Sequence, residues 1–267
     1  MAAQTSDNLN SNWQFRVYHG VEVYQALPLN HSGLVQGVST QSSGNMALHT
    51  GDLPEPVLKR RYSFLQALQL DLGQLVTANQ VHGVKVQKVD RQLAGAGARS
   101  LQTALPDTDA LITDEPGIVL AIFTADCVQV FLYDPDRPAV AVVHAGWRGT
   151  IARIVERTIE RMIREYQTLP ERMLAAIGPA ICKKCFQVNR DLADIFNKAD
   201  CLAVNKGGDR YYVDLIGFNF RLLTKAGIAP ENIFLSGACT SCQHQTFFSY
   251  RAGNQTGNRM MGIISLK

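Results

Sequence analysis

Apolar and polar positions follow two different periodicities along this chain. Four consecutive runs rich in Val, Ile, Leu and Ala predict β-strands at residues 109–113, 118–124, 128–133 and 139–144. Shorter strand-like runs occur at residues 21–24, 175–177, 233–236, 246–250 and 261–266, and two more flank a turn at 81–83. Together these runs predict a mixed sheet.

Helical spacing of apolar residues marks the other elements. The clearest helix runs from Ile151 to Tyr166, with Thr150 as its N-cap. Asn189 and Asp214 are predicted to begin two further helices. An earlier helix should begin near Asp52, where a capping acid precedes two prolines. Its predicted buried residues are Leu58, Tyr62, Leu65 and Leu68.

The order of these elements predicts a single α/β domain. No internal repeat and no long linker divides residues 13–267, and 267 residues are enough for one large core. The polar segment 1–12 is expected to be a disordered leader. The segment 91–100, rich in Gly and Ala, is expected to be a mobile surface loop.

Composition and charge exclude several classes of protein. The net charge is only +3, and the Lys and Arg residues form no basic tail, so we expect no nucleic-acid partner. The longest apolar stretch, 117–133, is interrupted by Thr124, Asp126 and Gln129, so it should not span a membrane. Because the N-terminus lacks the apolar core of a signal peptide, we expect a cytoplasmic protein with reduced cysteines. The oligomeric state is not predicted by any of these features.

Three short segments each place a candidate metal ligand beside a small residue, close to a strand-like run. These ligands are His82, Cys127 and His144. Two imidazoles and one thiolate suit zinc, and three protein ligands leave a fourth position open for catalysis. Spacings of 45 and 17 residues match no zinc-finger pattern, and a lone Cys or His is usually an ordinary packed residue. Local sequence alone therefore leaves both interpretations open.

The same segments carry a family resemblance. His-Ala-Gly-Trp-Arg-Gly at 144–149 and Ala-Asp-Cys at 125–127 resemble motifs of the laccase-domain family, historically called polyphenol oxidases. Residues 177–179, 239–240 and 247–251 extend the match, which covers the chain from about Gly37 to its end. The resemblance implies a bacterial-type zinc enzyme with a fold related to toxin cysteine deamidases. The implied reactions are phosphorolysis of adenosine, inosine or methylthioadenosine and deamination of adenosine, with purine nucleoside and phosphate as the partners.

Four further residues are candidates for the site. Asp126 could hydrogen-bond a ligand imidazole or cap a backbone turn, and the sequence favours neither. Arg148, between two glycines at a helix start, is a candidate anchor for phosphate or substrate, although a surface salt bridge is the alternative. Asn45 and His49 match family positions and could contact a base or ribose.

The chain also departs from the family pattern. Gln41 lies where relatives often have an arginine, and residues 256–259 contain one extra residue within the usual Thr-Gly-Arg. Both departures bear on substrate preference and rate. The cysteines Cys182, Cys185, Cys239 and Cys242 form two Cys-x-x-Cys pairs, but more than fifty residues separate the pairs. Buried or cavity-lining cysteines are therefore a better explanation than a four-thiolate metal site.

Three other functions compete with that of a zinc nucleoside enzyme. A multicopper oxidase needs about ten His ligands, and this chain has six, so copper is expected only as an adventitious substitute. A metal-free cysteine hydrolase would use Cys127 as nucleophile and His144 as base, which leaves His82 without a role. A weakly active nucleoside-binding protein is the third alternative.

Overall fold

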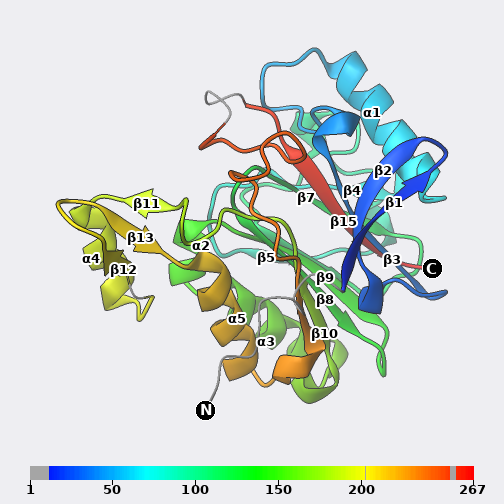
Figure 1. Ribbon diagram of the computed structural model, residues 1–267. Helices are drawn as coiled ribbons and strands as arrows, with labels where there is room; N and C mark the ends of the chain where they lie inside the picture. Colours follow the sequence, from blue (N-terminus) through cyan, green and yellow to red (C-terminus); the bar gives the residue numbers. More distant parts are fainter. Residues whose placement is uncertain (1–11, 202, 253–256) are drawn as a thin grey trace.

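Two six-stranded sheets form the centre of the molecule (Figure 1). The computed structural model describes residues 12–201, 203–252 and 257–267. The first sheet contains, in spatial order, β1 (Trp13–Tyr18), β2 (Val21–Ala26), β3 (Leu34–Ser39), β15 (Met260–Leu266), β7 (Val119–Thr124) and β4 (Leu75–Val76). The second contains β14 (Ile233–Leu235), β10 (Leu174–Ile177), β8 (Val128–Asp134), β9 (Ala139–Ala145), β6 (Ala110–Thr113) and β5 (Val86–Lys88). The predicted α/β class with mixed sheets is confirmed, whereas the predicted leader lies outside the described residues except for Asn12.

The two sheets pack against each other through one face each. In β7, Leu120 and Ile122 point into the layer between the sheets, and they meet Val140 and Val142 of β9 there. The alternate residues of both strands face outward and are covered by helices. Because successive side chains of a strand point to opposite faces, burial of both faces requires an apolar residue at nearly every position. This explains the four unbroken apolar runs of the sequence.

Helices cover the outer faces of both sheets (Figure 1). Helix α1 (Pro54–Ala67) packs on the first sheet through Phe64 and Leu65. Helices α3 (Ile154–Tyr166) and α5 (Leu215–Lys225) cover the second. A small lobe, at the left of Figure 1, contains α4 (Arg190–Lys198) and a three-stranded sheet of β11 (Gln187–Val188), β13 (Tyr211–Val213) and β12 (Ala203–Asn205).

Of the four predicted helix caps, Asn189 and Asp214 are confirmed, whereas Asp52 and Thr150 are wrong: the N-cap of α1 is Leu53, and Thr150 lies inside a helix. The side chain of Asn189 accepts a hydrogen bond from the N–H of Leu192, and that of Asp214 accepts one from the N–H of Gly217. The predicted helix after Thr150 is instead two helices, α2 (Trp147–Ile151) and α3. Arg153 between them has φ 64°, a left-handed conformation that an uninterrupted helix cannot contain.

The predicted burial along α1 is confirmed at Leu65 and Leu68 and wrong at Tyr62. Tyr62 is exposed, whereas the preceding Arg61 is buried and donates hydrogen bonds to the carbonyls of Met46, Gly97 and Ala98. A buried arginine does not count as apolar in a periodicity argument, so the sequence pattern placed Tyr62 on the buried face instead. The same bonds hold the end of the segment 91–100 against the protein, with Ala98 buried, whereas Arg91 and Gln92 are exposed. The segment is therefore irregular as expected but only partly on the surface, and its mobility stays a prediction.

Two further expectations can be compared with the structure. The predicted strand at 246–250 is wrong, because this segment consists of turns and irregular backbone. Among the helices of the described residues, none is both long and apolar enough to cross a lipid bilayer.

Candidate metal centre

The candidate ligands lie where the chain crosses from one sheet to the other. Residues 125–127 join β7 of the first sheet to β8 of the second, and Cys127 immediately precedes β8. His82 lies in the connection between β4 and β5, which also belong to different sheets. His144 is the second-to-last residue of β9 and pairs with Gln129 of β8. The sandwich therefore brings three ligands distant in sequence to one end.

The three side chains form a compact donor cluster. One ligand atom from each of His82, Cys127 and His144 can be chosen so that all lie within 4.8 Å of one another. The two imidazole rings meet edge to face, with centroids 4.7 Å apart, and the Cys127 Sγ is 3.8 Å from the His82 Nε2. Such separations suit a single ion bound by two nitrogens and one sulfur.

Gly146 makes this close approach sterically feasible. A Cβ atom at this position would lie 2.6 Å from the His82 Cδ2, 3.4 Å from the Cys127 Sγ and 3.5 Å from the His144 Cε1. Its φ of −62° is ordinary, so space and not backbone conformation requires glycine here. The glycine of the His-Ala-Gly motif is therefore part of the cluster.

Asp109, at the residue before β6, fixes both histidines. Its Oδ1 accepts a hydrogen bond from the His144 Nδ1 at 2.7 Å, which directs the Nε2 of that ring toward the cluster. The same carboxylate accepts the backbone N–H groups of Val81 (3.2 Å), His82 (3.0 Å) and Gly83 (2.7 Å). These bonds hold His82 at φ 60°, an uncommon conformation for a residue with a side chain.

Burial and charge shift the pKa values of this group of residues. Burial alone would raise the pKa of Cys127, but the neighbouring His144 and His82 lower it to about 6. Burial alone would lower the pKa of His144, but Cys127 and Asp109 raise it to about 9. The pKa of Asp109 is lowered, because the hydrogen bonds from His144 and the backbone outweigh its burial. Without a metal, Cys127 and His144 thus form a thiolate–imidazolium pair.

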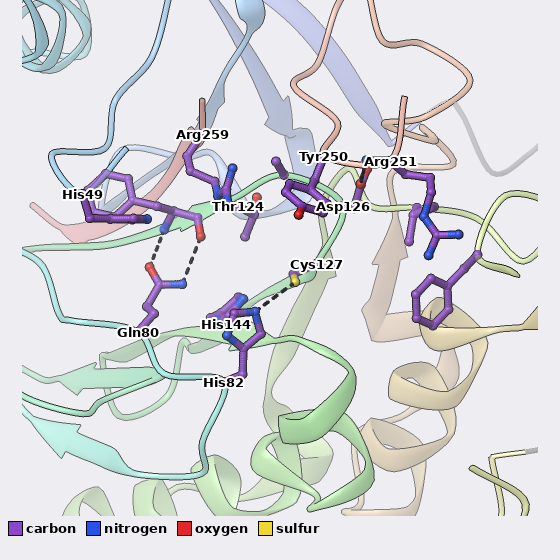
Figure 2. A pocket seen from close by; sticks show the side chains of 14 residues that line it. His49, Gln80, His82, Thr124, Asp126, Cys127, His144, Tyr250, Arg251 and Arg259 are labelled. Carbon is purple, nitrogen blue, oxygen red and sulfur yellow. Dashed lines mark hydrogen bonds between the residues drawn. The ribbon is translucent and has the colours of Figure 1, made fainter. Parts of the chain in front are cut away.

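A cavity of about 310 Å³ opens over the cluster. Figure 2 shows His82, Cys127 and His144 on one side of it and Arg259, Thr124 and Tyr250 on the other. The rest of its lining mixes apolar and polar side chains, namely Phe123, Ala125, Ile181 and Phe186 with His49, Gln80, Asp126 and Arg251. Its size is at the lower end of that of small-molecule sites.

Asp126 lines this cavity but does not contact either imidazole. Its Oδ1 accepts the hydroxyl of Thr240 at 2.6 Å, and its Oδ2 accepts the backbone N–H of Arg251 at 2.7 Å. Of the two roles that the sequence left open, the structure favours the backbone cap. Asp109 makes the carboxylate–imidazole contact instead.

The three candidate substrate-binding residues lie in different environments, and only one of them lines the cavity. His49 lines the cavity, and its partial burial together with Arg259 and Arg61 lowers its pKa, so the ring is neutral at pH 7. Asn45 is buried, and its side chain bonds to Ala47, Thr50, Asp52 and the backbone N–H of Arg259. Asn45 therefore positions Arg259 and is not free to contact a substrate. Arg148 is exposed, stacks on Trp147 at 4.3 Å and does not line the cavity.

Sequence reasoning missed two residues of this site. Asp109 begins an apolar strand, and a carboxylate at such a position is a signal that could have been noticed. Arg259 is the last residue of the segment 256–259 and lines the cavity, where Arg148 was expected; its Nη1 donates to the carbonyls of Gly257 and Asn258. Gln41 lies outside the cavity lining; its backbone N–H donates to the Thr246 carbonyl, and its amide can donate to the carbonyls of His244 and Gln245.

Comparison with known proteins agrees with this description. The model of the family described as "Multi-copper polyphenol oxidoreductase laccase" matches residues 31–267. The chain belongs to this family. The resemblance inferred from the motifs is thereby confirmed, although the family's description mentions several copper ions and the chain contains only six His.

Members of the family with other names are also similar to this chain. It is 36% identical over 250 residues to "Adenosine deaminase RL5" from an unknown prokaryotic organism, covering 91% of this chain and 94% of that protein. It is 34% identical to "Purine nucleoside phosphorylase YlmD" from Bacillus subtilis, covering 89% and 90%. The crystal structure of the Bacillus licheniformis hypothetical protein YfiH has 33% identity and a TM-score of 0.89, covering 95% and 99% of the two chains.

Proposed function

We propose that this chain is a zinc-dependent purine nucleoside enzyme. It would cleave adenosine, inosine or methylthioadenosine by phosphorolysis and deaminate adenosine. The observation that carries the proposal is the His82–Cys127–His144 cluster beside a cavity large enough for a small ligand. The names of the relatives, a phosphorylase and a deaminase, give the reaction classes.

The donor set fits zinc better than a group of copper ions. Imidazole and thiolate are both zinc ligands, and three of them leave one coordination position for a reactant. When bound, zinc supplies Lewis acidity, which lowers the pKa of a water molecule and withdraws electrons from a substrate oxygen or nitrogen. Asp109 keeps the Nδ1 of His144 occupied, so that the other nitrogen is the donor, and the lowered pKa of Cys127 provides the thiolate form.

The opposite wall of the cavity offers groups that suit a nucleoside and phosphate. Arg259 provides a cation for phosphate, and its backbone is held by Asn45. The hydroxyl of Thr124 is buried in the lining and finds no hydrogen-bond partner in the part of the chain that the structure describes, so it is available to a substrate oxygen. Phe123, Phe186 and Tyr250 provide aromatic surface for a purine base.

Product analysis tests the proposed reactions. Zinc-loaded protein is incubated with inosine, with and without phosphate, and with adenosine, and the products are separated by chromatography. Phosphate-dependent release of hypoxanthine with ribose 1-phosphate supports phosphorolysis, and inosine formed from adenosine supports deamination. If every purine nucleoside remains intact, the enzyme assignment is wrong and the nucleoside-binding alternative replaces it.

A pair of arginine variants tests the position of the phosphate site. Arg259→Gln should raise the KM for phosphate by about tenfold or more, because a charge-assisted hydrogen bond contributes about 1.5–3 kcal/mol. Arg148→Gln removes the same charge outside the cavity and should leave the KM unchanged. If Arg148→Gln raises the KM for phosphate and Arg259→Gln does not, Arg148 is the phosphate anchor. Since Gln41 does not line the cavity, the lack of an arginine at this position is expected to lower the rates little.

The thiolate–imidazolium pair supports a second candidate, a metal-free cysteine hydrolase. A nucleophilic Cys beside a His with a raised pKa is the arrangement that such hydrolases use. Activity that survives complete zinc removal and is lost on thiol alkylation would favour it. Activity that is lost with the metal and returns with it supports the zinc enzyme.

A further inference from the structure

The four cysteines of the two Cys-x-x-Cys pairs meet in space, although the sequence favoured separate roles for them. The sulfur atoms of Cys182, Cys185, Cys239 and Cys242 all lie within 4.8 Å of one another. Cys185 and Cys242 are 3.4 Å apart, and all four are free thiols. None of these residues lines the cavity or belongs to the cluster around Cys127.

The second sheet brings the two pairs together. Strands β10 and β14 are parallel neighbours, so the segments that follow them leave the sheet at the same edge. A further parallel bridge joins Ala180 to Cys239, and the Thr240 N–H donates to the Ala180 carbonyl at 3.2 Å. The separation of 57 residues along the chain is thereby reduced to one inter-strand distance in space.

Each pair also has the local turn that lets two cysteines bind one ion. The Cys185 N–H donates to the Cys182 carbonyl at 2.9 Å, and the Gln243 N–H donates to the Cys239 carbonyl at 2.9 Å. The Cys239 Sγ accepts two backbone N–H groups, from Cys182 at 3.3 Å and from Cys242 at 3.4 Å. Two donors directed at one sulfur favour a thiolate, because a neutral thiol is a weak acceptor.

We propose that these cysteines bind a structural zinc ion, distinct from the proposed catalytic zinc. At a Zn–S distance of about 2.3 Å, the sulfurs of a tetrahedral site lie about 3.8 Å apart, close to the separations found here. Four thiolates and one Zn²⁺ carry a net charge of −2. Lys183 and Lys184 lie in sequence between the first two ligands and add two positive charges to this loop, one of which is also 3.9 Å from the carboxylate of Asp214.

The proposed zinc would fasten one wall of the cavity. Ile181 and Phe186, at the two ends of the first ligand loop, line the cavity. Thr240, next to the ligand Cys239, donates its hydroxyl to Asp126, the neighbour of Cys127. Because the bound ion would join both segments, it would fix the backbone on which these residues depend.

Metal analysis of the wild-type chain and three variants separates the two sites. The wild-type chain should contain two zinc ions, Cys127→Ala should retain one, and the double variant Cys182→Ser/Cys185→Ser should retain the other. Cys201→Ala, a matched control at a buried cysteine outside both clusters, should keep two. One zinc in wild type, unchanged in the double variant, would overturn the four-cysteine site while leaving the catalytic proposal intact.

Cobalt substitution provides a measurement on the wild-type chain that does not depend on how the variants fold. With both sites filled, the thiolate-to-cobalt absorption of the wild-type chain should correspond to five thiolates, four from the four-cysteine site and one from Cys127. The His82–Cys127–His144 site alone would give one. Iron in place of zinc, or a disulfide between Cys185 and Cys242 found by mass analysis of protein purified under reducing conditions, would overturn the assignment.

Discussion

Replacing Asp109 by asparagine tests how the candidate metal ligands are held in place. The side chain is fully buried, and its two oxygens accept four hydrogen bonds, one from the His144 ring and three from backbone N–H groups around His82. Asparagine has nearly the same shape but replaces one oxygen with an NH₂ group. Whichever way the asparagine amide is turned, its NH₂ group faces two of the N–H donors that now bond to Asp109.

The size of the effect follows from these bonds. With the amide nitrogen on one side, two of the four donors lose their acceptor, and an unpaired buried donor costs about 1–3 kcal/mol. Loss of the partner of a ligand histidine typically weakens metal binding about 10- to 100-fold. This corresponds to about 1.4–2.8 kcal/mol of binding free energy. We therefore expect Asp109→Asn to bind zinc about 10- to 100-fold more weakly than the wild-type chain.

Competition with a chromophoric zinc chelator measures this affinity, and circular dichroism verifies that the variant is folded. Asp126→Asn is the matched control, because Asp126 lies next to Cys127 but its carboxylate bonds to Thr240 and the Arg251 backbone. Asparagine also tolerates its φ of 81°. The control should keep the wild-type affinity. Equal losses in both variants, or a loss in Asp126→Asn alone, would refute the role assigned to Asp109.

Three further predictions concern other parts of the structure. Gly146→Ala should lower zinc affinity at least about tenfold, measured by the same competition, because the new methyl group would overlap the His82 ring. In zinc-free protein, the alkylation rate of Cys127 should be half-maximal near pH 6, because the lowered pKa of about 6 makes the thiolate dominant above that pH. Arg61→Met should lower the free energy of unfolding in urea by about 3 kcal/mol or more, since three carbonyls lose their buried donor.

Each of these predictions has a control. Gly33→Ala, where the nearest atom would be 3.6 Å from the new Cβ, should leave zinc binding unchanged. A half-maximal alkylation rate near pH 8.5, the value of a free thiol, would contradict the pairing of Cys127 with His144. Arg60→Met removes a half-exposed ion pair with Asp52 and should cost less than about 1 kcal/mol. If it costs as much as the change at Arg61, burial does not explain the stability of that helix face.

The periodicity of the sequence identified most of the elements but misplaced several details. Four consecutive strands, two helix caps and the α/β class follow from local patterns, because apolar spacing and capping side chains act within a few residues. The prediction for α1 was wrong at Tyr62, because the adjacent Arg61 is buried instead, through carbonyls supplied by residues 46, 97 and 98. The strand expected at 246–250 has suitable residues, yet no neighbouring strand pairs with it among the described residues.

The sequence by itself identified the candidate metal ligands and, through its motifs, the family. The small residues beside His82, Cys127 and His144 are local features, so they can be recognised in the sequence without knowledge of the fold. Only the tertiary structure decided which carboxylate supports them, because Asp109 is 35 residues from His144 and reaches it by strand pairing between β6 and β9. Arg259 and the four cysteines likewise reach their neighbours in the fold from distant parts of the chain. Parallel and antiparallel pairing creates contacts whose separation along the chain has no preferred value, so spacing in the sequence cannot reveal them.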